Sequence, residues 1–182
     1  MKKVLLINSS TRKISNSRLL AYKVLEGIIF NEVNLRNYCV NEVKDFRSSE
    51  YWPCQNDDYY KIIKLLINSD IIVFSTPIYW YGISGLLKNF IDRWSESLKT
   101  NTFFRKKMGM KSFVLVLVGG DNPLKKASII KKQFQYIAEF FNAKFIDCVI
   151  GQSNTRINVF YDFIALSKAE EVNIYLKSII KE

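Results

Sequence analysis

The most informative stretch of the chain is Phe74-Ser-Thr-Pro-Ile-Tyr-Trp-Tyr-Gly-Ile-Ser-Gly-Leu-Leu-Lys-Asn-Phe-Ile-Asp-Arg-Trp94. An apolar run, Ile71 to Phe74, leads into it and stops at Thr76-Pro77. An aromatic and glycine loop follows, and the apolar residues then recur with helical spacing at Leu86, Leu87, Phe90, Ile91 and Trp94. This pattern predicts a buried strand, a loop at its carboxyl end and a helix. Ligands of open α/β sheets bind in the crevice at these carboxyl ends, and a loop rich in aromatic side chains and backbone amides suits a flat, conjugated ligand.

Apolar runs and helical patterns alternate along the rest of the chain. Strands are predicted at 4–7, 33–35, 71–74, 113–118 and 145–150, and helices at about 19–30, 57–67, 84–98, 123–141 and 165–180. Strict alternation predicts a parallel sheet with helices on both faces. Five strands favour the order 2-1-3-4-5 over a six-stranded Rossmann sheet. The expected fold class is α/β, a flavodoxin-like three-layer α/β/α sandwich in which residues 1–182 form a single domain.

Particular residues mark the ends of the predicted helices. Ser84 is suited to cap the third helix, and Pro123 to open the first turn of the fourth. Asp57 and Asp58 stand at the expected start of the second helix, where carboxylates interact favourably with the helix dipole.

Two segments between the predicted elements look irregular. Residues 36–56 show no period and contain the breaker Trp52-Pro53. The densest basic cluster, Arg105-Lys106-Lys107 with Lys111, precedes the fourth strand and is expected in an exposed loop.

The composition is that of an ordinary globular protein, with 48% hydrophobic and 24% charged residues. No apolar run approaches the roughly 20 residues that span a bilayer. The apolar part of the amino terminus ends at Asn8, well short of a signal-peptide core. We therefore expect a cytoplasmic protein without a membrane segment.

The residue types that are missing or scarce narrow the possible chemistry. The chain has no histidine, which excludes Ser-His-Asp and Cys-His hydrolases and His-ligated metals. Cys39, Cys54 and Cys148 are widely spaced and fit neither a disulfide framework nor a metal site. The chemistry of an enzyme with this sequence would come from a cofactor.

The net charge of +10 comes from 27 Lys and Arg against 17 Asp and Glu. Such a surplus attracts phosphates, anionic cofactors or nucleic acid. The positive residues are dispersed along the chain, which favours a solvated surface over a binding stripe.

The loop from the first strand to the first helix is polar. Residues 9–17 provide five hydroxyls, one amide and two cations: Ser9, Ser10, Thr11, Ser15, Ser17, Asn16, Arg12 and Lys13. Backbone N–H groups at a helix amino terminus bind anions, and hydroxyl donors with Arg12 would complete a phosphate cradle. Without glycine the loop is neither a Walker A loop nor a dinucleotide fingerprint. The alternative is a polar helix cap without a ligand.

The loops after the third and fourth strands would lie beside the first. In the former, Pro77 fixes a turn, Gly82 allows close backbone approach, and Tyr79, Trp80 and Tyr81 could flank a ring system. Trp80 and Tyr81 could equally cover the sheet end or form a subunit interface. In the latter, Gly119-Gly120 leaves backbone amides accessible, while Asp121 and Asn122 read as ordinary turn residues. One phosphate loop and two ring loops together describe a site for flavin mononucleotide (FMN).

The same residues resemble a known family. The strand followed by Ser10-x-Arg12-x-x-Ser15-Asn16-Ser17 is similar to the FMN-phosphate loop of the NAD(P)H-dependent FMN reductases, which include iron–sulfur flavoproteins and relatives of quinone reductases. The segment from Asp70 to Arg93 is similar to that family's almost residue for residue. The resemblance covers about residues 1–150.

The resemblance implies a cofactor, an activity and a set of site residues. NADPH or NADH would pass hydride to bound FMN, which would reduce a quinone, flavin, nitro or azo acceptor. Ser10, Arg12, Ser15, Asn16 and Ser17 would bind the phosphate, and Pro77, Ile78, Tyr79, Trp80, Gly82, Gly119 and Gly120 would contact the ring. No metal is expected, because Cys54 alone remains where iron–sulfur flavoproteins have several cysteines and one thiolate cannot hold a cluster. Relatives are commonly homodimers, with Trp80, Tyr81 or Tyr51-Trp52 as possible interface residues here.

Two other functions remain open from the sequence. A flavodoxin-type carrier would shuttle single electrons without a substrate of its own, although flavodoxins are typically acidic and this chain is basic. A nucleic-acid-binding protein on the same fold would use the basic surface, but no basic stripe with interleaved aromatics is present.

Overall fold

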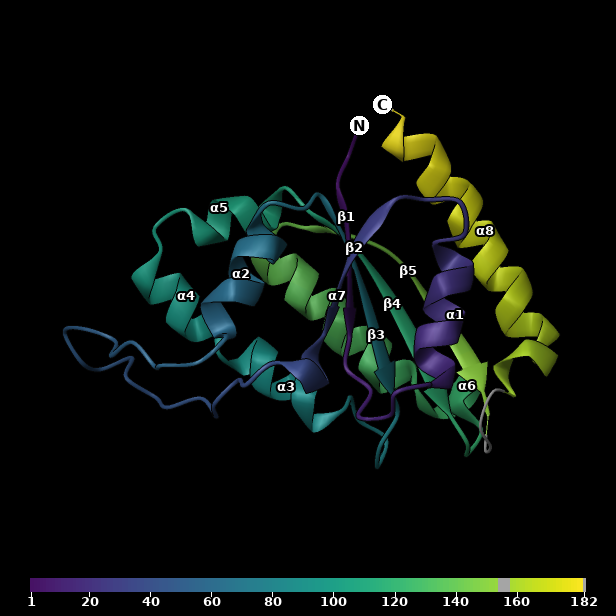
Figure 1. Cartoon of the computed structure of the whole chain (residues 1–182), viewed down its shortest axis with the longest axis horizontal. Coiled ribbons are helices and arrows are strands. Elements are labelled where there is room, and N and C mark those ends of the chain that lie inside the picture. Colours follow the sequence, from purple (N-terminus) through teal and green to yellow (C-terminus); the bar gives the residue numbers. More distant parts are fainter. Residues whose placement is uncertain (154–157, 182) are drawn as a thin grey trace.

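A central parallel sheet organises the molecule in the computed structural model, which describes residues 1–153 and 158–181 (Figure 1). Its strands are β1 (Val4–Asn8), β2 (Phe30–Asn34), β3 (Ile71–Pro77), β4 (Ser112–Gly119) and β5 (Lys144–Gln152). They pair in the order β2-β1-β3-β4-β5, and every pairing is parallel. The predicted fold class and strand order are confirmed.

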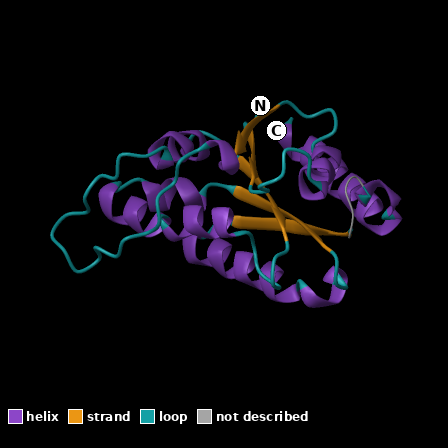
Figure 2. Cartoon of the chain, turned by 60° about the horizontal axis from the view of Figure 1, so that its bottom comes forward, coloured by secondary structure: helices purple, strands orange, loops and turns teal. Residues whose placement is uncertain are grey.

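Helices cover both faces of this sheet. They are α1 (Asn16–Val24), α2 (Tyr59–Ile67), α3 (Gly85–Asp92), α4 (Trp94–Thr100), α5 (Phe104–Gly109), α6 (Pro123–Lys126), α7 (Ser128–Phe141) and α8 (Phe163–Ile180), with 3-10 turns at Leu35–Asn37 and Val159–Tyr161. Helices α1 and α8 lie on one face and α2, α3, α4, α5 and α7 on the other (Figures 1 and 2). In the described part of the chain no helix is long and apolar enough to cross a membrane.

The strands explain the uniform apolar runs of the sequence. In β1, Leu5 and Ile7 belong to the core under α2, α3 and α7, whereas Val4 and Leu6 belong to the core under α1 and α8. Both faces are therefore buried, and the usual alternation of apolar and polar residues disappears.

The first helix is shorter than predicted. It ends at Val24, and Phe30, which was assigned to its end, begins β2, while Leu35 lies in a 3-10 turn. The helical spacing of apolar residues continues through Ile28, but Gly27 has a φ of 72°, a left-handed conformation that stops the helix.

Two other predicted helices are each divided in the structure. The helix predicted at 84–98 breaks at Arg93 into α3 and α4, and the one at 123–141 breaks at Ala127 into α6 and α7. The apolar pattern hides the first break because Phe90 and Trp94, on either side of it, pack into the same core. The predicted ends are confirmed: the Ser84 hydroxyl accepts from Leu87 N at 3.3 Å, and Pro123 opens α6.

The basic cluster before β4 was predicted in an exposed loop, and the exposure of Arg105, Lys106 and Lys107 is confirmed while the loop is not. Arg105, Lys106 and Lys107 lie on α5, which is anchored by the buried side chains of Phe104 and Met108. Lys111 is itself only 3% exposed. Its Nζ donates to the carbonyl oxygens of Ile67 and Ser69, so it closes the carboxyl end of α2. Burial lowers the pKa of the Lys111 amine to about 8.

Candidate functional site

The loops that follow β1, β3 and β4 meet because these strands are neighbours in the sheet. A cavity of about 220 Å³, which we call the loop cavity, is lined by Ser10, Arg12, Ser15, Asn16, Ser17, Pro77, Ile78, Tyr79, Val118, Gly119, Gly120 and Ser153. A second cavity of about 210 Å³, the turn cavity, is lined by Ile78, Trp80, Tyr81, Gly119, Gly120, Asp121, Pro123, Lys126 and Ala127. The two cavities share Ile78, Gly119 and Gly120 and are therefore adjacent.

The predicted site residues are nearly all brought together here. Ten of the twelve line the loop cavity. Trp80 lines the turn cavity instead, and Gly82 lines neither cavity. The prediction omitted Val118 and Ser153. The polar Ser153 directly follows β5, so extending the argument about strand ends to the fifth strand would have found it.

The first loop is shaped by its own hydroxyl groups. Ser10 is buried, and its hydroxyl accepts from Arg12 N at 3.2 Å, which turns the chain. The Ser15 hydroxyl caps α1 by accepting from Arg18 N at 3.3 Å and lies 3.5 Å from the Ser17 hydroxyl. The first N–H groups of α1 have no carbonyl partner within the helix, so this end of the cavity presents donors.

Asn16 has a structural task in addition to lining the cavity. Its Nδ2 donates to the Ser153 hydroxyl at 2.7 Å, and its Oδ1 accepts from Asn158 N at 3.1 Å and Val159 N at 3.3 Å. The side chain therefore ties the first loop to the segment after β5 and fixes where α1 begins.

Arg12 is the cation available to a ligand at this end. Its side chain is exposed at the cavity and makes no ion pair with any residue in 1–153 or 158–181. Arg18, in the first turn of α1, is committed elsewhere, because it donates to both carboxylate oxygens of Glu32 at 2.7 Å. Hydroxyls, helix N–H groups and one uncommitted guanidinium form a donor set that fits a phosphate dianion.

The other end of the loop cavity is built from backbone and apolar groups. Ile78 N donates to Val118 O at 2.8 Å and holds the second loop against β4. A Cβ on Gly119 would come within 3.1 Å of the Ile78 side chain, so a larger residue there would require Ile78 to shift by a few tenths of an ångström. This end supplies a narrow wall with backbone polar groups, which fits the edge of a flat ring rather than a second charged group.

The second loop ends in a tight hairpin turn. Tyr79 and Gly82 exchange both backbone hydrogen bonds at 3.0 Å, with Trp80 and Tyr81 between them. Trp80 has a φ of 48° and Tyr81 a φ of 61°, so both adopt the left-handed conformation that is costly for residues with a Cβ.

The Tyr81 hydroxyl donates to Asp121 Oδ2 at 2.8 Å, and Lys126 also pairs with that oxygen. Hydrogen bonds from Lys126 and Tyr81 lower the pKa of the Asp121 carboxyl. Asp121 thus joins two loops and does more than the turn role expected for it.

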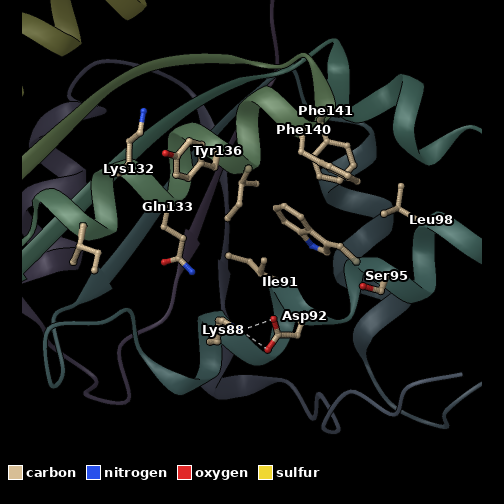
Figure 3. Close-up of a pocket in the computed structure, with 13 residues that line it drawn as sticks. Lys88, Ile91, Asp92, Ser95, Leu98, Lys132, Gln133, Tyr136, Phe140 and Phe141 are labelled. Atoms are coloured by element: carbon tan, nitrogen blue, oxygen red, sulfur yellow. Dashed lines mark hydrogen bonds and ion pairs between the residues drawn. The ribbon is translucent and has the colours of Figure 1, made fainter. Parts of the chain in front are cut away.

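A larger hollow than the loop cavity and the turn cavity lies elsewhere. It is a groove of about 620 Å³ between α3, α4 and α7, shown in Figure 3. Its walls are mainly apolar, and its Lys88 and Asp92 are paired with each other at 2.6 Å (Figure 3). Because it lacks convergent polar donors and is lined by helix residues and not by the loops that follow the strands, it is not the candidate cofactor site.

The cysteines form no metal site in the structure. Cys39 and Cys54 are exposed and Cys148 is buried. Among the described residues, no group of three or more Cys, Asp or Glu side chains is placed to hold a metal ion.

Comparison with known proteins gives a consistent result. Residues 2–144 match the family model described as NADPH-dependent FMN reductase. A Bacillus subtilis protein, YwqN, whose name describes an NAD(P)H-dependent FMN-containing oxidoreductase, is 37% identical over 93% of this chain and 96% of its own length.

Solved structures support the same assignment. The Trp repressor binding protein from Bacillus subtilis is 33% identical, with a TM-score of 0.80 over 93% of this chain and 97% of its own. An FMN-dependent NADH-azoreductase from Bacillus anthracis, solved with FMN, has a TM-score of 0.71 over 97% of this chain and 99% of its own. At 14% identity it shows the fold alone. The family resemblance predicted from the motifs is confirmed, and this chain belongs to the NADPH-dependent FMN reductase family.

Proposed function

We propose that this chain is an enzyme that transfers hydride from NADPH or NADH, by way of FMN, to a quinone, flavin, nitro or azo acceptor. One observation carries the proposal beyond family membership. The phosphate-type donors of the first loop and the narrow backbone wall of Gly119 and Gly120 line a single cavity. Phosphate and ring sites are thus within one ligand's reach at the carboxyl edge of the sheet.

Each group in the cavity has a definable task in this proposal. Arg12, Ser15 and Ser17 would bind the FMN phosphate together with the N–H groups of α1. The backbone N–H of Gly120 after β4, which donates to no other described residue, would stabilise negative charge at the polar edge of the ring. FMN, when bound, supplies the capacity to accept and release hydride, so no side-chain acid or base is required. This agrees with the absence of histidine from the sequence.

The direct test is the visible spectrum of the FMN-loaded protein under anaerobic NADPH. We expect the flavin absorbance to bleach and to return when a quinone is added, with steady oxidation of NADPH when both are present. A parallel titration with NADH measures the donor preference. A flavin-loaded sample that NADPH and NADH both leave coloured would contradict the reductase. A long-lived semiquinone without turnover would support the electron-carrier alternative.

We also propose that the protein is a cytoplasmic homodimer, the cytoplasm being where it would meet NAD(P)H. The groove in Figure 3 supports a second copy as occupant of that face. Ile129, Tyr136 and Phe140 follow one another along α7 and are 67%, 58% and 55% exposed, an apolar row that lines the groove. Trp52, by contrast, is only 7% exposed and packs on Phe46, so its ring is not available to an interface.

Light scattering tests the dimer. We expect a mass of twice 21.3 kDa for the native chain. Ile129→Asp, which places a charge at the first position of the apolar row, should shift the mass towards the monomer without changing the circular dichroism. Met110→Asp, at an equally exposed apolar residue outside the groove, is the control and should leave the mass unchanged. A monomeric native protein at tens of micromolar would contradict the dimer.

A further inference from the structure

The turn between Tyr79 and Gly82 has a sequence that its backbone does not favour. Two-residue hairpin turns with left-handed central residues are normally Asn-Gly or a similar pair, because other side chains strain the backbone. Here the central residues are Trp80 and Tyr81, with φ values of 48° and 61°. Turn stability therefore does not account for them, and strain of this kind accompanies functional segments.

Tyr81 has an explanation within the protein. Its hydroxyl donates to Asp121 at 2.8 Å, and the Nζ of Lys126 pairs with the same carboxylate and lies 5.2 Å from the Tyr81 ring centroid. We call Tyr81, Asp121 and Lys126 the clasp. It connects the loop after β3 with the loop after β4 and with α6 through side chains, in addition to the backbone hydrogen bond from Ile78 N to Val118 O.

Trp80 has no such explanation. It is 97% exposed, whereas the other two tryptophans, Trp52 and Trp94, are 7% and 3% exposed. The Trp80 side chain makes no ring contact, ion pair or hydrogen bond with the described residues. It lines the turn cavity, so the strained turn presents a large aromatic surface to whatever enters there.

The turn cavity restricts what that ligand can be. Ile78, Pro123 and Ala127 give it an apolar wall, and its two charged groups, Asp121 and Lys126, neutralise each other in the clasp. Its volume of about 210 Å³ is below the usual range for drug-sized ligands, so it would enclose a small ligand completely and, as the loop cavity would for FMN, only part of a large one. It shares a wall with the loop cavity, so a ligand in it would lie next to the cofactor. These properties fit an uncharged, flat molecule of one or two rings.

We propose that the clasp positions the Trp80–Tyr81 turn so that Trp80 stacks on an uncharged one- or two-ring quinone in the turn cavity. The choice of a quinone as the acceptor rests on the proposed function. Tyr81, Asp121 and Lys126 are positioning residues in it, because they act through the placement of Trp80 and need not touch the quinone.

The first experiment requires neither cofactor nor turnover. Amide hydrogen exchange of the FMN-free protein measures opening of the turn at Tyr79 N and Gly82 N, the two amides bonded across it. Tyr81→Phe and Asp121→Ala each remove a hydrogen bond to a charged group and leave the backbone strain in place. We expect exchange at both amides to quicken by about threefold or more. Unchanged exchange would overturn the clasp, even if the enzyme proves active.

A matched control exists on the other side of the sheet. Lys144 Nζ donates to the Tyr175 hydroxyl at 2.5 Å and also lies 5.2 Å from that ring centroid. Tyr175→Phe therefore removes a tyrosine hydroxyl hydrogen bond next to a lysine without affecting either cavity. It should leave exchange at Tyr79 and Gly82 at the native rate.

The second experiment measures the functional consequence. With 1,4-naphthoquinone as acceptor, Tyr81→Phe, Asp121→Ala and Trp80→Leu should raise KM for the quinone about threefold or more and change kcat less. For Tyr81→Phe and Asp121→Ala, FMN affinity should stay within twofold of native, since neither residue lines the loop cavity. If amide exchange at the turn is faster in a variant but its KM for the quinone is native, the proposed link between the clasp and the acceptor is overturned. A change of oligomeric mass in Trp80→Leu with unaltered KM would overturn it in favour of a protein contact. If no acceptor is reduced at all, the proposed function fails, while the exchange result still decides the clasp.

Discussion

Arg93→Met is expected to lower the free energy of unfolding by about 3–5 kcal/mol, because it leaves two buried carboxylates without a counter-charge. The Arg93 side chain is completely buried. Its Nε and one terminal nitrogen donate to Glu96 Oε2 at 2.9 and 2.8 Å, and the other terminal nitrogen pairs with Asp57. Both carboxylates are buried as well, so water cannot replace the lost guanidinium.

The position of this network explains why its loss would affect the whole fold. Arg93 stands at the break between α3 and α4, and Asp57 lies just before α2, 36 residues earlier. The guanidinium carbon is 4.1 Å from the centroid of the Tyr59 ring, and the Tyr59 hydroxyl donates to Arg93 O at 2.6 Å. One side chain thus holds the irregular segment before α2 against two helices.

Urea denaturation measures the effect and separates it from a general loss of charge. Arg93→Lys keeps the charge but not the planar fork of donors, and should also be clearly destabilising. Arg47→Ala breaks an exposed ion pair with Asp45 and serves as the control, since such pairs contribute little. Its denaturation midpoint should stay at the native value. If Arg93→Met does not fold, Glu96→Gln provides a milder variant. A loss below about 1 kcal/mol for Arg93→Met would contradict the assigned role.

The architecture was predictable from sequence because it depends on local patterns. Buried parallel strands leave uniform apolar runs, and Ile71 to Phe74 or Phe113 to Val118 can hardly be read otherwise. Because strands and helices alternate and crossover connections are right-handed, few topologies of the sheet remain. Arg12 and Ser15 could be recognised as candidate residues from local sequence as well. They lie at the amino terminus of the helix that follows the first strand, and this point is at the carboxyl edge of the sheet, where ligands bind.

Features that depend on residues distant in the sequence could not be predicted from the sequence. The helical pattern does not mark Arg93 as buried, because its partner Asp57 is distant in sequence and was assigned to the helix dipole. Lys111 was assigned to a loop for the same reason, since only the fold brings it to Ile67 O. The left-handed backbone of Trp80 could not be foreseen either, as propensity argues against it and the stabilising contact to Asp121 comes from another loop.

Arg12→Ala is expected to weaken FMN binding by roughly 10- to 100-fold, the usual effect of losing a charge-assisted hydrogen bond to a ligand phosphate. The side chain is exposed and has no ion-pair partner among the described residues, so its removal should not alter the fold. Quenching of flavin fluorescence gives the dissociation constant, and an unchanged circular dichroism spectrum confirms that the variant is folded.

Riboflavin turns this measurement into a test of which part of the ligand Arg12 contacts, since it has the same ring system without the phosphate. Arg12→Ala should leave riboflavin binding unchanged, so that the preference for FMN over riboflavin falls by the same factor as FMN affinity. Lys13→Ala is the matched control from the same exposed loop, because Lys13 does not line the loop cavity. It should lower FMN affinity only slightly, and only at low salt. Equal losses for FMN and riboflavin would show that Arg12 acts on the ring or on the loop conformation. No loss for either would mean that the phosphate is bound elsewhere, and would contradict the assignment of the first loop as its cradle.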